Sequence, residues 1–571
     1  MQSSTTSRWS WLVTALLLCN TGAGAQAIWY VDDDGPGDPG PGDPTISDPL
    51  EDGSPEHPFD AIQEGVNHAV NDDIVLVVDG TYAGPGNLRV EFGGRLITVR
   101  SENGPQNCII DCGGSASQAF YLHNGETPAA VIDGFTMSHA CVPVLVISSF
   151  AAATLRNCIF RENPAITGPG AVNLSSASLS STTLFEHCSF ISNSSGGSHG
   201  GAAYVLHSRV AFVECEFRDN HVNNRGGAIS IDDSEVSAVS CSFVHNSSNT
   251  YGGGLHINGY QGHVDLMDCV FVGNHAGAFG GGIASWDVEP SVMMVYLRHC
   301  TFAGNGAELG RSIAHELDTE NNIVYLSWNS IYRDGPYGES GEGIYGGNGT
   351  FGFWYCDVSG IGYEGCIDAD PLFVQPPDPG PDEEWGTEDD NHGDLRLQAG
   401  SPCIDAADCT EVPADVFDLD GDGDTMEPIP FDLDGQPRCV DDPATDDTGV
   451  GFPCVDMGAH EFQPTSDVLP WEDLAAIARE PAIRAAGPSP FNLRTTIGIG
   501  APRPGVVKLA VYDVHGRRLR TLWDGVIEAG RHCMVWEGID ERGGKAPSGI
   551  YLVRLERAGD PPRSVKVVLT R

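Results

Sequence analysis

A six-residue phrase that begins with cysteine and ends with asparagine occurs six times in the middle of the chain. In every copy a phenylalanine follows the cysteine by two residues, and the copies are spaced by 26 to 31 residues. The cysteines are Cys158, Cys188, Cys215, Cys241, Cys269 and Cys300, and the asparagines are Asn163, Asn193, Asn220, Asn246, Asn274 and Asn305. A period of this size with small length changes is typical of stacked repeat proteins.

The phrase predicts strands rather than helices. Cysteine and phenylalanine stand two residues apart, so in a strand their side chains point to the same face. The block has no 3.6-residue apolar period, which argues against helical repeats. We therefore expect an all-β fold, a right-handed parallel β-helix of about ten coils. We also expect buried cysteine thiols, and stacked asparagines that take a left-handed turn and bond to one another between coils.

The phrase and the small residues after it carry a family resemblance. Clusters such as Gly226-Gly227-Ala228-Ile229 follow most copies. FxxN followed by GGA[ILV] resembles the repeats of the chlamydial polymorphic outer membrane proteins and related right-handed β-helix proteins. A short helix near residues 58–67, with Asp60 as its N-cap, and the strand 75–82 resemble the N-terminal entry of pectin-lyase-like β-helices. The resemblance implies a β-helix over residues 28–375, with the helix covering its open end.

Residues 1–27 resemble a secretory signal peptide, with Arg8 before an apolar run and a small-residue cleavage site. The sequence therefore predicts a secreted or outer-surface protein with no membrane span after signal removal. The net charge of the chain is −49. Only the C-terminal part is basic, because from Arg479 onward there are 16 Lys+Arg against 9 Asp+Glu. The acidic remainder argues against nucleic acid or an anionic polymer as a charge-driven partner.

Seventeen cysteines in an exported chain suggest disulfides outside the repeated phrase. The pairs that we expect lie in irregular regions: Cys108/Cys112, Cys356/Cys366, Cys403/Cys409 and Cys439/Cys454.

The part of the chain after the repeats divides into three segments. Residues 376–464 form an acidic segment whose succession of short motifs resembles the closing segment of many exported bacterial β-helices. Residues 465–487 are predicted to be a linker. Residues 488–571 resemble the FlgD-type Ig-like domain and the C-terminal sorting domain of type IX secretion substrates, through SPFNLRTTI, VYDVHGRRLRTL and SGIYLVRLE. This resemblance implies a small β-sandwich that has the secretion machinery as a partner.

The acidic segment contains a candidate calcium loop. Its acidic residues are Asp418, Asp420, Asp422 and Asp424, with Gly423 at the turn, as in the first half of an EF-hand loop. Ile429 stands where the twelfth-position glutamate is expected, and Glu427 or Asp432 could replace that ligand. A solvated acidic loop without an ion is the alternative interpretation.

The sequence also contains candidate catalytic residues, although it lacks a recognisable catalytic motif. β-Helices of the resembled kind often cleave acidic polysaccharides with paired carboxylates, or with calcium and a basic residue. The candidates are Asp232, Asp233, Arg209 and Arg225, and further acids are Glu214, Asp318 and Glu320. The coil histidines are interpreted as exposed loop residues, and Trp286, Trp328, Trp354 and Tyr355 either stack on sugars or pack between coils. We therefore predict an adhesive, structural or carbohydrate-binding protein, with a polysaccharide lyase or glycoside hydrolase as the alternative.

Overall fold

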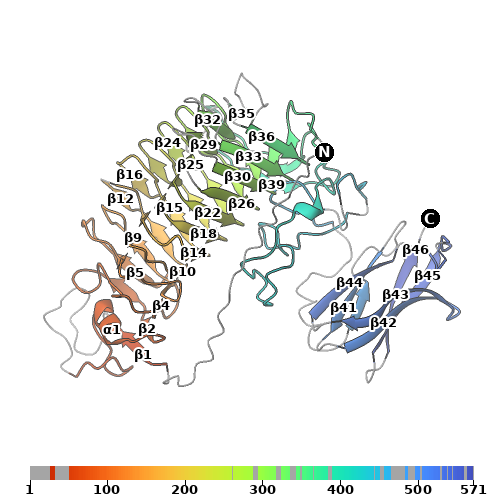
Figure 1. The fold of residues 1–571 in the computed structure, drawn as a ribbon, viewed down its shortest axis with the longest axis horizontal. Coiled ribbons are helices and arrows are strands. Elements are labelled where there is room, and N and C mark those ends of the chain that lie inside the picture. The colour runs from red at the N-terminus through yellow and green to blue at the C-terminus, as the bar shows by residue number, and fades with distance from the viewer. Residues whose placement is uncertain are drawn as a thin grey trace, which may run out of the picture.

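The computed structural model describes residues 26–32, 50–166, 168–259, 262–286, 293–316, 323–334, 343–346, 350–363, 365–382, 389–442, 444–450, 455–464, 482–485, 495–501, 505–527, 530–536, 538–542, 544–557 and 562–569. Residues 1–25 of the predicted signal peptide, Cys454, Asp318 and Glu320 lie outside the described residues. Three long parallel sheets, which we call sheets I, II and III, form the walls of a β-helix whose coils stack in chain order (Figure 1). This confirms the predicted fold class.

Sheet I has twelve strands: β1 (Ile28–Val31), β2 (Ile74–Val77), β4 (Thr98–Ser101), β7 (Val131–Asp133), β10 (Thr154–Arg156), β14 (Thr183–Glu186), β18 (Arg209–Val213), β22 (Glu235–Val239), β26 (His263–Met267), β30 (Met293–Arg298), β33 (Ile323–Trp328) and β36 (Thr350–Trp354). Sheet II has eleven: β3 (Gly80–Tyr82), β5 (Cys108–Asp111), β8 (Thr136–Ser138), β11 (Ile159–Arg161), β15 (Ser189–Ile191), β19 (Glu216–Arg218), β23 (Ser242–Val244), β27 (Val270–Val272), β31 (Thr301–Ala303), β34 (Ile331–Tyr332) and β37 (Asp357–Val358).

Sheet III has nine strands: β6 (Phe120–Leu122), β9 (Leu145–Ser148), β13 (Val172–Ser175), β17 (Ala203–Leu206), β21 (Ile229–Asp232), β25 (Leu255–Asn258), β29 (Ile283–Trp286), β32 (Ile313–Glu316) and β35 (Ile344–Tyr345). A fourth, short sheet contains β12 (Pro164–Ala165), β16 (Ser194–Ser195), β20 (His221–Val222), β24 (Ser247–Ser248) and β28 (His275–Ala276). The strand counts of sheets I to III agree with the prediction of about ten coils.

The repeated phrase spans two corners of each coil. The residue before each cysteine has a positive φ, which is 50° for Glu214. The residue before each asparagine also has a positive φ, which is 58° for Asp219. The short strand of sheet II runs between these corners. The left-handed position is thus the residue before the asparagine, and the prediction that the asparagine itself takes this turn was wrong. The asparagine is buried inside the corner, where its side chain forms hydrogen bonds with backbone groups that have no backbone partner.

The asparagines form the predicted ladder. Each side-chain Nδ2 donates to the Oδ1 of the asparagine in the next coil, over 2.9–3.0 Å, from Asn163 through to Asn305. Each Nδ2 also donates to a carbonyl of the preceding coil, as Asn193 does to Phe160 O over 2.8 Å. At the end of the ladder Asp334 accepts from both nitrogens of Asn305.

The phenylalanines and cysteines of the phrase fill the core beside this ladder. Phe160, Phe190, Phe217, Phe243, Phe271 and Phe302 stack with ring centroids 4.6–4.8 Å apart and nearly parallel planes. This distance matches the strand spacing, so each ring lies on the ring of the neighbouring coil. The six cysteines are at most 2% exposed, as predicted, and the thiol of Cys188 donates to Leu155 O and Glu186 O.

The helix α1 (Ile62–His68) stands beside the first coils. Asp60 is not its N-cap: Ala61 occupies that position and makes no side-chain capping bond. Asn87 of the next coil caps the helix instead, since its Oδ1 accepts from Ile62 N over 2.8 Å. The sequence pattern could not show this, because the capping residue comes from 25 positions away.

The acidic segment covers the outer face of sheet II. Its strand β39 (Asp394–Leu397) pairs antiparallel with β38 (Phe373–Gln375), which directly precedes the segment, and it contains the short 3-10 helix η1 (Cys409–Glu411). Its apolar residues, among them Leu397, Ile404 and Met457, pack against outward side chains of β27, β31 and β34. Arg438, which is fully buried, pairs with Asp268 between β26 and β27 and with Glu461. The segment therefore covers the side of the β-helix.

The C-terminal part is a β-sandwich, as predicted. One sheet contains β40 (Ala482–Ala485), β41 (Thr495–Ala501) and β44 (Gly530–Trp536), and the other β43 (Arg518–Ile527), β42 (Gly505–Asp513), β45 (Gly549–Arg557) and β46 (Arg563–Leu569). Trp536 is fully buried in the core between them, and its Nε1 donates to Ile539 O over 3.0 Å. Strand β40 lies within the predicted linker, so the domain begins earlier than expected. No helix among the described residues is both long and apolar enough to cross a membrane.

Three of the four expected disulfides are not formed, and the fourth pair is only partly within the described residues. No bond joins Cys108 to Cys112, Cys356 to Cys366 or Cys403 to Cys409, and Cys454 lies outside the described residues. The Cys403 thiol instead donates to Asp357 Oδ2, over 3.8 Å. The thiols of Cys356 and Cys366 are hydrogen-bonded to each other, which lowers the pKa of Cys366 to about 7.

Candidate functional site

Polar and aromatic side chains gather on the outer face of sheet III, across β13, β17, β21, β25 and β29. We call this group the sheet III surface: Asn173, His199, Tyr204, Arg225, Ser230, Asp232, Tyr251, His256 and Trp286. Register places Tyr204, Ser230 and His256 in one row across neighbouring strands. Bridges align a second row, His199, Arg225 and Tyr251, one turn before the strands.

The glycines after each member of the second row make this alignment possible. Gly226 has a φ of +70°, and a Cβ there would stand 2.3 Å from Ile229 O. A Cβ on Gly227 would stand 2.1 Å from Gly253 O in the next coil. Only glycine fits both positions, so the turn is tight and the residue before it lies close to the strand row.

Arg225 is enclosed by aromatic rings. Its guanidinium lies 4.5 Å from the ring centroid of Trp286 and 5.8 Å from that of Tyr251. These two rings are themselves stacked, with centroids 5.8 Å apart. Among the described residues Arg225 makes no ion pair, and its buried Nε has no acceptor. The arrangement presents a cation held by aromatic contacts and available to an oxygen ligand.

Beside Arg225 lies a hydrogen-bonded acid. Tyr204 donates to Asp232 Oδ2 over 2.7 Å, and His199 stacks on Tyr204 with its Nδ1 4.0 Å from the same oxygen. Burial lowers the pKa of His199 although Asp232 opposes this shift, and the charge of Arg225 lowers it further. Burial and the nearby Asp232 raise the pKa of Tyr204. At neutral pH these shifts favour a neutral imidazole and a protonated phenol beside Asp232.

Buried polar atoms without a hydrogen-bond partner are concentrated on this surface. They are Asn173 Oδ1, His199 Nδ1, Arg225 Nε, Ser230 Oγ, Asp232 Oδ1 and both ring nitrogens of His256. His256 is fully buried beneath the aromatic residues, and burial followed by the charge of Arg225 holds its pKa well below the ordinary value. Buried polar groups are normally bonded, so these seven atoms indicate a ligand or ordered water at this face.

The structure separates the predicted catalytic residues. It brings Arg225 and Asp232 together on the sheet III surface. Arg209 lies on sheet I, where its Nε donates to Glu235 over 2.6 Å. Asp233 stands at the following corner with a φ of 45°, and its side chain faces His207 at 3.5 Å. Asp232 and Asp233 therefore do not form a carboxylate pair on one face.

The other predicted aromatic and acidic candidates lie elsewhere. Trp328 and Trp354 stack on the outer face of sheet I at 4.9 Å, beside Arg298, whose charge is already paired with Asp265. They do not form one platform with Trp286 on sheet III. Glu214 pairs with His187 over 2.7 Å.

The predicted calcium loop forms a turn with converging carboxylates. Oxygens of Asp418, Asp420 and Asp422 lie within 4.8 Å of one another, and Asp420 forms a second such group with Asp415 and Glu427. Asp424 belongs to neither group and accepts from Met426 N over 3.0 Å.

Three features of this loop could not be read from the sequence pattern. Asp415 is 1% exposed and its Oδ1 has no partner, although the pattern begins only at Asp418. Burial, and then the charge of Asp420, raises the pKa of Glu427 to about 7. Ile429 is buried against Val239 and Met267 on the β-helix, which explains the apolar residue at the twelfth position.

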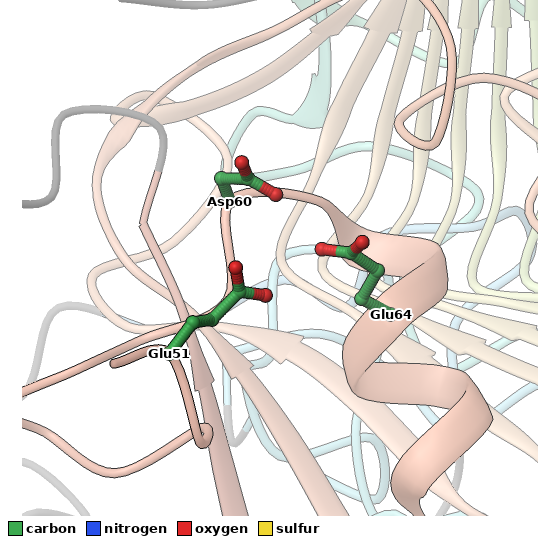
Figure 2. Close-up of side chains that lie close together, drawn as sticks. All are labelled: Glu51, Asp60 and Glu64. Carbon is green, nitrogen blue, oxygen red and sulfur yellow. The ribbon is translucent and has the colours of Figure 1, made fainter. Parts of the chain in front are cut away.

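A third group of carboxylates lies near the N-terminus. Glu51, Asp60 and Glu64 point toward one another beside α1, with oxygens within 4.8 Å (Figure 2). Asp60 and Glu64 share a hydrogen bond, and burial followed by this bond raises the pKa of Asp60 to about 6. All three residues are half-buried, so water reaches the group. A proton shared between Asp60 and Glu64 accounts for this geometry.

Comparison with family models identifies the C-terminal part of the chain. Residues 486–560 match the family model of the FlgD Ig-like domain. No curated protein sequence matches the chain. The crystal structure of pectate lyase Pel9A is similar at 13% identity, covering 77% of this chain and 98% of that one, with a TM-score of 0.44.

Two further solved structures are similar at lower scores. They are XylC in complex with xylose (8% identity, 61% of this chain and 87% of that one, TM-score 0.29) and a mannuronic acid-specific polysaccharide family 6 lyase from human gut microbiota (10% identity, 53% and 87%, TM-score 0.24). All three of these TM-scores are below 0.5, so we infer the function from this chain's own residues.

Proposed function

We propose that this protein is an exported β-helix that binds a polysaccharide on the sheet III surface. The observation that carries the proposal is the set of unpaired buried polar atoms beneath the Arg225 and Trp286 cluster. Carbohydrate sites combine flat aromatic faces, which take the apolar faces of sugar rings, with a few fixed donors and acceptors. Trp286 and Tyr251 supply the faces, Arg225 the donors and Asp232 the acceptor.

The charges on this surface favour a neutral or sparsely charged glycan. Arg225 and Asp232 offer one positive and one negative group, which together match a pair of neighbouring hydroxyls. The part of the chain before Arg479 carries a net charge of −56, which repels a polyanion. A single carboxylate on the ligand could still pair with Arg225 in the bidentate manner that guanidinium groups favour.

Glycan array binding with matched variants tests the proposal. Arg225→Ala and Trp286→Ala should each weaken binding at least about tenfold, because both remove groups from the centre of the contact. Arg209→Ala and Trp328→Ala are the matched controls on sheet I and should bind as the wild type does. Equal binding by all five proteins, or no binding by the wild type to any neutral or acidic glycan, would contradict the proposal.

Polysaccharide cleavage is a second candidate function. The observation in its favour is the Tyr204–Asp232 hydrogen bond beside His199, because a phenol, an imidazole and a carboxylate can move protons at neutral pH. Incubation with the bound glycan should then release reducing ends, with an unsaturated product if the reaction is an elimination. Tyr204→Phe should abolish release while preserving binding. Intact glycan after incubation with the wild type would leave binding alone.

Export and calcium complete the proposal. The predicted signal peptide of residues 1–27 and the FlgD Ig-like match at 486–560 support delivery to the outer surface or the medium, with the C-terminal domain as the contact for the secretion machinery. The loop of Asp415 to Glu427 would bind calcium where it lies on the β-helix. If Asp418→Asn/Asp420→Asn binds as much calcium as the wild type in equilibrium dialysis, the loop is not a calcium site.

A further inference from the structure

We propose a separate divalent cation site, best suited to calcium, formed by Asp405, Asp441 and Asp447 in the acidic segment. One carboxylate oxygen from each residue lies within 4.8 Å of the other two. Calcium–oxygen bonds are about 2.3–2.6 Å long, so two ligands of one ion lie at most about 5 Å apart. The three carboxylates therefore fit around a single ion.

Asp405 provides the observation that distinguishes this group from a solvated acidic patch. Its side chain is 0% exposed, one oxygen accepts from Asp442 N over 3.0 Å, and the other, Oδ1, has no hydrogen-bond partner. A buried carboxylate oxygen without a partner carries a large desolvation cost. The carboxylates of Asp441 and Asp447 lie beside it, and like charges add to that cost.

The backbone around Asp405 brings the other ligands to it. Asp405 O accepts from Thr448 N and Gly449 N, both over 3.0 Å, and Asp405 N donates to Asp456 Oδ1 over 2.8 Å. The loop of residues 441–449 is thus bonded to Asp405 at both of its ends. A cation here would join this loop to the part of the segment that packs on β27 and β31.

Two other buried acids of the segment are satisfied without an ion. Asp432 accepts from three backbone N–H groups, and Asp442 from Ala444 N and Thr445 Oγ1. The buried Arg438 is already paired with Asp268 and Glu461. Asp405 and Asp415 each have a buried oxygen without a partner, and each belongs to a group of three carboxylates.

Calcium titration of the full chain tests the site independently of glycan binding. Asp447 and Asp446 are both exposed, so their asparagine variants should fold equally well and differ by the same charge. In a background of Asp418→Asn/Asp420→Asn, which removes the predicted loop site, Asp447→Asn should bind one calcium ion fewer per chain. Asp446→Asn should bind the same number as the background. The titration should extend to about 1 mM free calcium, the weak end for extracellular sites.

Three results would overturn the proposal. In the first, Asp447→Asn and Asp441→Asn bind as many calcium ions as the background does. In the second, Asp446→Asn loses as much calcium as Asp447→Asn, which would show a diffuse charge effect. A background protein that binds no calcium would likewise assign Asp405 as a neutral, protonated acid.

Discussion

Replacement of Asn220 by alanine tests whether the asparagine ladder holds the coils together. Asn220 is fully buried and its side chain makes four hydrogen bonds: Nδ2 donates to Phe190 O and Asn246 Oδ1, and Oδ1 accepts from Asn193 N and Asn193 Nδ2. Alanine leaves both donors of Asn193 without an acceptor. Each buried donor left unsatisfied costs about 1–3 kcal/mol, so the two together should cost about 4 kcal/mol.

The matched control is Asn223→Ala, three residues further along the same coil. Asn223 is exposed, and its Nδ2 donates to Gly196 O over 3.2 Å, so water can replace the bond. We expect a loss below about 1 kcal/mol. Urea unfolding of the three proteins measures both values, and amide hydrogen exchange around Asn193 shows whether the loss is local. Equal losses in the two variants would refute the reasoning that links the ladder to stability.

Asn220→Asp supplies a second comparison. Aspartate keeps an acceptor for Asn193 but places an oxygen against Phe190 O and Asn246 Oδ1, where the ladder needs a donor. The chain itself has aspartate only at the ladder end, where the oxygens of Asp334 accept from Asn305 and Ser312. We therefore expect Asn220→Asp to be at least as destabilised as Asn220→Ala at neutral pH, and to recover part of the loss at low pH.

Three further predictions concern other parts of the chain. Arg438→Met should cost about 3–5 kcal/mol in urea unfolding because it leaves Asp268 and Glu461 buried without a cation, whereas Arg396→Met, at an exposed pair, should cost under about 1 kcal/mol. In the presence of chelator, thermal stability should fall as the pH rises from about 4 through about 6, because the pKa of Asp60 is higher in the folded protein than in the unfolded chain. The Asp60→Asn variant should lack this part of the decrease. If the wild type and Asp60→Asn lose stability in parallel over this pH range, the raised pKa of Asp60 is contradicted. The six cysteines of the repeated phrase should react with a thiol reagent only when the protein unfolds. Rapid labelling of these cysteines in the native protein would show that the coils open.

The repeated phrase was sufficient to predict the β-helix because each residue type in it has one structural task. Phenylalanine stacks, asparagine bonds between coils, and cysteine fills the corner, so the period alone places all three. The covering of sheet II was not predictable in the same way. It depends on contacts such as the hydrogen bond that Gly458 N donates to Asn329 O, between residues more than a hundred positions apart. No local sequence pattern predicts such contacts.

The sheet III surface was predictable in principle from an alignment of the repeats. The residue before each first glycine gives His199, Arg225, Tyr251 and Phe279, and the third residue after each second glycine gives Tyr204, Ser230 and His256. The first set is aligned by bridges and the second by strand register. Such a site is difficult to recognise in the sequence because each coil contributes one residue, about 26 positions from the next. These residues become neighbours only when the coils stack.

Burial, in contrast, could not be read from the acidic segment. Asp405 and Asp446 look alike in a chain with 79 acidic residues, yet one is 0% exposed and the other faces solvent. The difference arises because Asp405 lies against the apolar residues that pack on sheet II, while the loop bearing Asp446 turns outward. A protein under selection for solubility alone would not place a carboxylate oxygen there without a partner, since the desolvation cost opposes folding. The cation proposed for Asp405 would offset this cost, and the stability of the acidic segment would then depend on the free calcium concentration.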